Sequence, residues 1–151
     1  MIDLTAAIVS GLAATFIFDI WAMLARATGL TTMRVENALG SIFTEGKRMV
    51  FTGMLIHFAF GMGIALIYAA IFEQTGAVNG PLTGGIIGLL HGLIIGLIVL
   101  PMMGTLHPAM RAGRVEIPGF FAINKGSASP LYIMIGHLIF GSVIGAVYFM
   151  I

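Results

Sequence analysis

The sequence predicts an all-α integral membrane protein, a four-helix bundle built from two tandem two-span repeats. Of its 151 residues, 59% are hydrophobic and only 9% are charged, and the mean hydropathy is +1.08. A soluble domain carries about 25% charged residues, so this composition excludes a soluble globular enzyme. A net charge of +1 argues against a disordered chain and against a nucleic-acid-binding protein. Since cysteine is absent, disulfides and Cys-ligated metal sites are also excluded.

Four apolar stretches are long enough to cross a bilayer core about 30 Å thick, which requires roughly 20 residues per helix. Their apolar runs are continuous and do not alternate as membrane strands do, so we predict one helix in each. No basic residue precedes the first stretch, and we therefore expect no cleaved signal peptide. The four predicted spans form one transmembrane domain over residues 1–151 and cover about 4–25, 50–72, 82–103 and 131–151.

The basic residues predict how the chain is oriented. All of them lie in the two long connections, between the first and second spans and between the third and fourth. The positive-inside rule then places both long loops in the cytoplasm and both termini outside, in a bacterial or archaeal cytoplasmic (inner) membrane. The seven residues are Arg26, Arg34, Lys47, Arg48, Arg111, Arg114 and Lys125.

Two local features modify this simple pattern of spans. In the first long loop, apolar residues recur at helical spacing from Val35 to Phe43, which predicts a short helix lying along the lipid headgroups. Near the end of the third span, Pro101 and the pair His107-Pro108 predict that the helix bends or stops.

A shift of 80 residues aligns two parts of the chain without a gap. The segment from His57 to Tyr68 lies over the segment from His137 to Tyr148, with the shared pattern H-x-x-F-G-x-x-I-[AG]-x-x-Y. The same shift places Arg34 over Arg114. We predict two repeats, 1–72 and 80–151, related by a pseudo-twofold axis along the membrane normal. The second and fourth spans would then be equivalent partners, with His57 and His137 at the same depth.

The third span carries glycine at every fourth position. Small residues at this spacing allow two helices to approach closely, so this face predicts either the packed centre of the bundle or a subunit interface. The four residues are Gly84, Gly88, Gly92 and Gly96.

Ionisable side chains inside the spans are the candidate functional residues, because such residues are costly in lipid and usually face the bundle interior. Asp19, His57 and His137 are predicted to share one layer, with His91 deeper in the membrane. A first hypothesis is a cofactor-holding subunit in a redox or respiratory context, with haem b between His57 and His137. Gly61 and Gly141 would leave room for the macrocycle, and Arg34 or Arg114 would bind its propionates.

The same residues support other hypotheses. A transition metal would be bound by His57, His137 and Asp19, with His91 as a further ligand. The same four side chains would otherwise form the path of a small proton-coupled transporter that acts as a dimer.

A cofactor-free scaffold or assembly subunit is the remaining alternative, with histidines that only form hydrogen bonds between spans. Tyr68 and Tyr148 would then be anchors at the membrane interface. Expected partners are membrane lipids and either further copies of this chain or a larger membrane complex, but no nucleic acid. No nucleophile–base pair or phosphate loop is present, so we expect no self-contained enzyme.

Several short motifs resemble those of small bacterial four-span proteins, a domain-of-unknown-function group of the YagU-like type. The resemblance extends over most of the chain and implies four helices and a bacterial inner-membrane location. It implies no activity and no ligand. The motifs are Met33 to Phe43, Ile56 to Gly61, Leu100 to Gly104, Ala128 to Leu131 and His137 to Tyr148.

Overall fold

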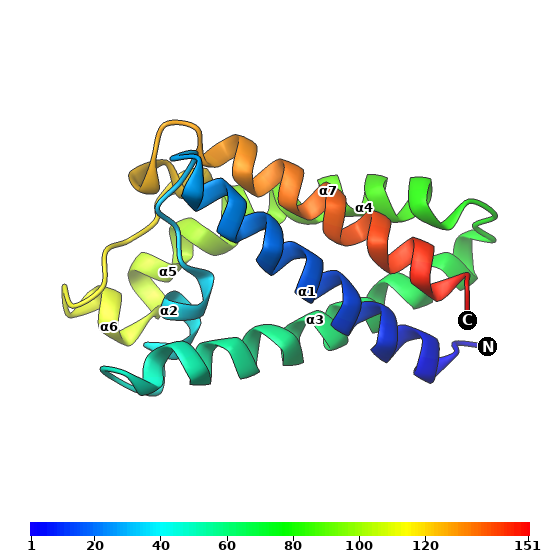
Figure 1. Ribbon diagram of the computed structural model, residues 1–151, viewed down its shortest axis with the longest axis horizontal. Coiled ribbons are helices and arrows are strands. Elements are labelled where there is room, and N and C mark those ends of the chain that lie inside the picture. Colours follow the sequence, from blue (N-terminus) through cyan, green and yellow to red (C-terminus); the bar gives the residue numbers. More distant parts are fainter.

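The computed structural model describes all 151 residues, and every regular element in it is helical. Both termini lie at one end of the bundle, called here the terminal end, and the two long connections lie at the opposite loop end (Figure 1). The predicted bundle of four apolar helices is confirmed, and the fold is that of a multi-pass membrane protein. The four candidate spans are Leu4–Ala27, Arg48–Thr75, Gly80–Leu106 and Ser129–Tyr148.

Local sequence signals determine where these helices begin and end. Helix α1 (Leu4–Ala27) begins after Asp3, whose carboxylate accepts a hydrogen bond from the Ala6 N–H at 2.9 Å. Helix α3 (Arg48–Thr75) ends at Gly76, which adopts the left-handed conformation with φ of 62°. Helix α4 (Gly80–Ile94) is capped by Asn79, and α7 (Ser129–Tyr148) has Pro130 in its first turn.

The third span is one continuous rod with a π-helical turn. After α4 the chain forms the π-turn Ile95–Val99 and then α5 (Leu100–Leu106), where the Leu100 N–H reaches five residues back to the carbonyl of Ile95. Pro101 has no N–H to donate and its ring crowds the preceding turn, which accounts for the widened turn just before it. The span ends before His107-Pro108, as predicted, and Pro108 begins the short α6 (Pro108–Arg111).

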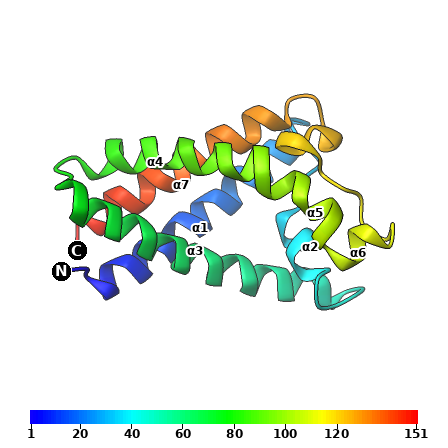
Figure 2. The same ribbon diagram turned by 180° about the vertical axis from the view of Figure 1, so that it is seen from behind.

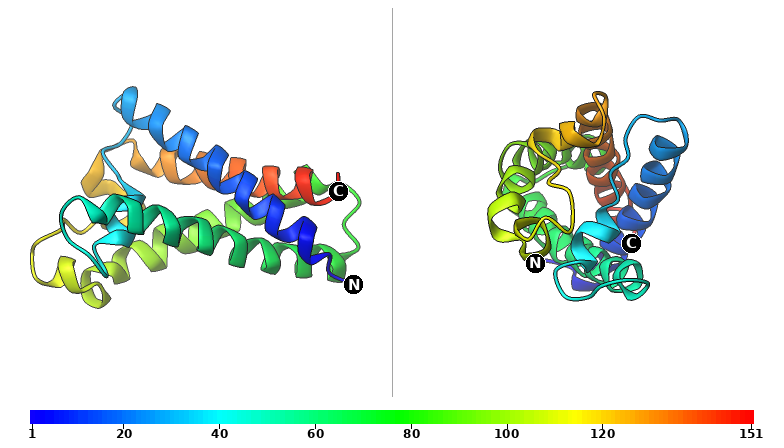
Figure 3. Two further views of the ribbon diagram at one scale, coloured as in Figure 1. Left: turned by 60° about the horizontal axis from the view of Figure 1, so that its bottom comes forward. Right: turned by 90° about the vertical axis from the view of Figure 1, so that its left-hand side faces the viewer.

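The first long connection contains the predicted short helix, α2 (Val35–Gly40). It packs against α3 through two glycines, because a Cβ on Gly40 would overlap the Met49 carbonyl and one on Gly53 would overlap the Glu36 carbonyl. The position of α2 relative to the lipid headgroups stays a prediction. The apolar periodicity of α2 serves packing inside the loop end, where the second connection supplies the short helix Phe120–Lys125 opposite it (Figure 3).

The four spans pack unevenly around the bundle. Helix α1 contacts both α3 and α7, and α7 packs along α4, whereas α3 touches α4 and α7 only slightly. Figure 2 shows α1 and α7 crossing behind α3 and the α4–α5 rod. The predicted pseudo-twofold would pair α3 with α4 as closely as α1 with α7, and this symmetric packing is not found. The sequence repeat itself stays a prediction.

The predicted glycine face of the third span is the packed face between α4 and α7. A Cβ on Gly84 would overlap the carbonyl of Gly141, and one on Gly88 would overlap the carbonyl of His137. At the terminal end, Gly80 and Gly145 meet in the same way. The two backbones therefore touch along most of α4, and the face forms the packed centre of this helix pair.

Candidate functional site

A cavity of about 290 Å³ lies where α3 and the α4–α5 rod diverge. Fourteen of its 18 lining residues are hydrophobic, and the other four are Gly61 and the three histidines His57, His91 and His137. Two lining side chains, Phe60 of α3 and Val99 of the π-turn, are 58% and 41% exposed. They mark an opening on the outer surface of the bundle, on the side where lipid would lie.

One polar contact of the site joins α1 to α3. The Nδ1 atom of His57 lies 3.1 Å from the Oδ1 atom of Asp19, and both side chains are mostly buried. The ring is turned so that this pair makes no well-aligned hydrogen bond, and Asp19 Oδ2 also has no partner in the protein. The pair is an electrostatic contact that has free hydrogen-bonding capacity inside the membrane-spanning region.

The other two histidines form a separate pair. The ring centroids of His91 on α4 and His137 on α7 are 4.8 Å apart in an edge-to-face arrangement. His137 Nδ1 donates to the Ile133 carbonyl at 2.8 Å, which leaves its Nε2 free to accept. His91 Nδ1 lies 3.4 Å from the hydroxyl of Tyr68 on α3. His91, expected deeper, therefore joins His137 in the same cluster.

The ring of Phe18 on α1 connects the two polar groups. Its centroid lies 5.7 Å from that of His57 and 5.4 Å from that of His137, edge-on in both cases. Phe18 also contacts Tyr132 and Phe140 of α7. The predicted pair His57 and His137 therefore line one cavity, but both imidazoles pack against an aromatic ring of α1.

The structure brings together most, but not all, of the predicted site residues. Gly61 lines the cavity, yet a Cβ there would overlap Thr15 of α1. The space beside Gly141 is occupied by the backbone of Gly84 on α4. The prediction that these two glycines leave room for a macrocycle is wrong, because neighbouring helices use that room. Arg34 and Arg114 lie at the loop end, where Arg114 pairs with Glu45 of the other connection.

The predicted metal ligands divide into two separate groups. His57 faces Asp19, whereas His91 faces His137. No set of three or more His, Asp or Glu side chains in the protein is arranged to hold a metal ion. The four residues therefore do not form a metal centre in this arrangement.

Tyr68 is a further residue whose predicted role the structure corrects. It was expected at the membrane interface, but it is 2% exposed and contacts His91. The repeat pattern contained a signal for this position. Tyr68 follows His57 by eleven residues, which places both side chains on the same face of the helix. Phe18 and Tyr132 carry no such signal, because an aromatic residue in a span is equally typical of a lipid-facing position.

A fourth histidine, His107, bridges the two long loops beside the cavity. Its Nε2 donates to the Ala38 carbonyl of α2 at 2.7 Å, and its Nδ1 accepts from the Met110 N–H at 3.3 Å. The Ser41 hydroxyl lies 3.3 Å from the same Nε2. Since Ala38 and Leu39 line the cavity, His107 holds the helix that covers its loop end.

Comparison of this chain with protein-family models, with curated proteins and with solved structures finds no match.

Proposed function

We propose that this membrane protein binds a hydrophobic small molecule from the bilayer in the cavity between α3 and the α4–α5 rod. The observation that carries the proposal is the lining, which is apolar except for Gly61 and the imidazoles of His57, His91 and His137. Small-molecule sites are typically apolar cavities of about 300–1,000 Å³ with a few converging polar groups. At about 290 Å³ the cavity lies at the lower end of that range.

The polar groups favour a binding role over simple packing. Histidine and aspartate inside membrane spans are costly and usually serve a function. Here His57 Nδ1, on a residue that lines the cavity, and Asp19 Oδ2 beside it have no hydrogen-bond partner in the protein. A ligand that carries a hydroxyl, carbonyl or amine would satisfy at least one such group, while its apolar part would fill the rest of the cavity.

The charge distribution supports an orientation with the loop end in the cytoplasm. All seven basic residues lie at or next to the two long connections, and the turn between α3 and α4 contains none. The positive-inside rule then places both termini outside, in a bacterial or archaeal cytoplasmic membrane. A reporter that is active only on the non-cytoplasmic side of the membrane tests this orientation. It should be active when fused to Ile151 and inactive when inserted after Gly113.

Binding is tested by energy transfer from Trp21, the single tryptophan of the chain. Its indole N–H donates to the carbonyl of Tyr132, a residue that lines the cavity, at 3.0 Å. We expect saturable transfer from Trp21 to cis-parinaric acid methyl ester, a neutral polyene, in detergent-solubilised protein. Val99→Phe, which fills the cavity, should abolish the saturable component.

A neighbouring substitution provides the matched control. Ile98 precedes Val99 in the π-turn and is exposed, but it does not line the cavity. Ile98→Phe should therefore bind the ester as the unmodified protein does. If neither the protein nor the control binds any hydrophobic probe while both stay helical by circular dichroism, the scaffold hypothesis is favoured and the proposal fails.

The haem b hypothesis is a particular case of ligand binding. His57 and His137 line one cavity, which supports it. A flat macrocycle would nevertheless have to displace Phe18, and the space beside Gly141 is already filled. A smaller ligand therefore fits better. A Soret band with split α and β bands, lost in His57→Ala and in His137→Ala, would restore haem as the ligand.

Proton-coupled transport is a second candidate, favoured by the Asp19–His57 contact of 3.1 Å. A carboxylate beside an imidazole inside a span is a suitable pair for proton transfer. In proteoliposomes, this function predicts a proton flux that Asp19→Asn abolishes and that the Ile98→Phe control retains. Crosslinking in the same liposomes tests the dimer that such a transporter would require.

A further inference from the structure

A second, polar pocket of about 120 Å³ lies at the loop end, directly next to the cavity. Met33 and Ala38 line both, so a single layer of side chains separates the two spaces. The pocket is formed by the two long connections, and its charged and hydroxyl-bearing lining residues are Thr32, Arg34, Glu116 and Lys125.

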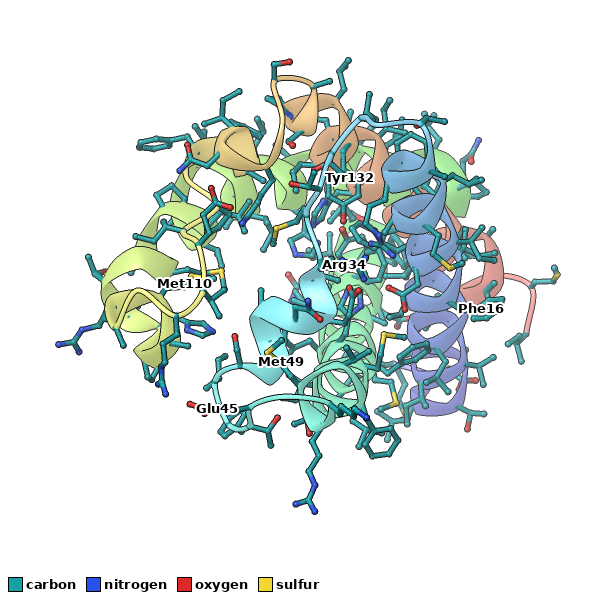
Figure 4. The ribbon with its side chains drawn as sticks, turned by 60° about the vertical axis from the view of Figure 1, so that its left-hand side comes forward. Phe16, Arg34, Glu45, Met49, Met110 and Tyr132 are labelled. Atoms are coloured by element: carbon teal, nitrogen blue, oxygen red, sulfur yellow. The ribbon has the colours of Figure 1, made fainter.

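Arg34 contributes an available cation to this pocket. Its side chain is 58% exposed, and its nearest carboxylate oxygen, on Glu36, is 3.8 Å away. This distance is too long for a hydrogen bond, so the guanidinium keeps its donors free. Figure 4 looks toward the loop end and shows Arg34 beside α2, with Met110 across from it and Tyr132 above.

Lys125 contributes a second cation, and the fold fixes its position. Its backbone carbonyl accepts hydrogen bonds from the Thr32 N–H at 2.7 Å and from the Thr32 hydroxyl at 3.0 Å. Its side chain is only 15% exposed, whereas that of its ion-pair partner Glu116 is 66% exposed. Because Glu116 is the solvent-facing member of this pair, its carboxylate can turn outward while another anion takes its place on the buried ammonium of Lys125.

The charges around the pocket leave a positive excess. Arg26 lies close by, with its guanidinium donating to the Met33 carbonyl at 3.4 Å. The pocket lining itself carries two cations, Arg34 and Lys125, and one carboxylate, Glu116. Two cations against one carboxylate favour an anionic occupant, because Arg and Lys donors bind carboxylate and phosphate oxygens strongly.

We propose that the ligand is an amphiphile whose carboxylate or phosphate head binds between Arg34 and Lys125, while its chain passes Met33 and Ala38 into the cavity. This inference rests on the proposed function, because the cavity must accept the chain. The polar pocket and the apolar cavity lie side by side in the order that such a molecule requires.

The test compares two probes that differ only in the charge of the head group. Binding of cis-parinaric acid and of its methyl ester is measured by energy transfer from Trp21 at neutral pH. We expect the acid to bind about tenfold more tightly than the ester, a difference of about 1.4 kcal/mol. Arg34→Gln and Lys125→Gln should each reduce this preference to about twofold or less, without changing the affinity for the ester.

Two variants control for fold and for general surface charge. Lys125→Arg keeps the charge and should keep the preference for the acid. Arg111→Gln removes an exposed cation that does not line the pocket and should leave both affinities unchanged. Competition with palmitic acid and with lysophosphatidic acid, against the neutral monopalmitoylglycerol, distinguishes a carboxylate source from a phosphate source.

The possible results separate this inference from the proposed function. Equal binding of acid and ester, or an unchanged preference in both Gln variants, overturns the anionic site and leaves the hydrophobic cavity standing. Failure of both probes to bind overturns the cavity function as well. Loss of ester binding in Lys125→Gln, with Lys125→Arg intact, would also overturn the inference, because the lysine would then act on the chain and not on the head.

Discussion

The third span has two faces that meet their neighbours in opposite ways. Toward α7 it presents glycines, and the two backbones touch from Gly80 to Gly88. Toward α3 it presents His91, Ile95 and Val99, and a cavity separates the helices. The same rod therefore forms the tightest and the loosest contact of the bundle.

The difference shows what brings helices together in a bilayer. Because lipid is as apolar as a leucine side chain, no hydrophobic force drives helices together, and close approach depends on small residues. On α3, Gly53 and Gly61 face α2 and α1, and no glycine of α3 faces α4. The open side therefore follows from where the small residues lie, and the imidazoles are placed where the helices remain apart.

The largest effect is expected on the closed face. Gly84→Val would place a Cβ against the Gly141 carbonyl, where neither backbone can give way. We expect destabilisation beyond about 3 kcal/mol, at or above the upper end of usual overpacking effects. Unfolding by sodium dodecyl sulfate in mixed micelles measures it. Gly63→Ala, at a glycine with open space around it, is the control and should stabilise α3 by up to about 1 kcal/mol.

A smaller effect is expected at the wall of the cavity. Phe18→Ala removes a buried ring that contacts His57 and His137. We expect a loss of about 3 kcal/mol, the low end for this substitution, because the ring already faces open space. The control Phe16→Ala removes a lipid-exposed ring of the same helix. If Phe16→Ala costs as much as Phe18→Ala, the contrast between cavity wall and outer surface fails.

The stability of the loop end beside the cavity depends on His107. His107→Ala removes its hydrogen bonds to the Ala38 carbonyl and the Met110 N–H and leaves those groups buried. We expect destabilisation of about 2 kcal/mol, from two bonds of about 1 kcal/mol each. Proteolysis of the loops should also accelerate. Unchanged proteolysis and stability would show that α2 is held by its glycine contacts with α3 alone.

The smallest effect is expected at the hydroxyl of Tyr68. Tyr68→Phe removes a long contact of 3.4 Å to His91 and should cost about 0.5 kcal/mol. Its counterpart Tyr148→Phe removes a contact to the exposed Asp3 N–H at the terminal end and should cost still less. A cost above about 2 kcal/mol at Tyr68 would mean that the open side is held together by its polar groups.

Much of the fold and of the candidate site could be predicted from the sequence. The four spans follow from run length, and the packed face of α4 follows from glycine at every fourth position, since both depend on local periodicity. Asp19, His57, His91 and His137 were recognisable because ionisable groups within spans are few. Their grouping into two pairs was not, because it depends on which helices are neighbours.

The sequence by itself determined the four membrane-spanning helices and the glycine face along which α4 packs, because these follow from hydropathy and from spacing along a single helix. Only the tertiary structure decided that Gly141 packs against α4, that Tyr68 contacts His91 and that α2 covers the loop end of the cavity. The reason is that an apolar helix satisfies its own backbone and can pack against several neighbours. Two helices approach closely only where small residues on both of them meet. No such residues meet between α3 and α4, so the space beside His91 stays open.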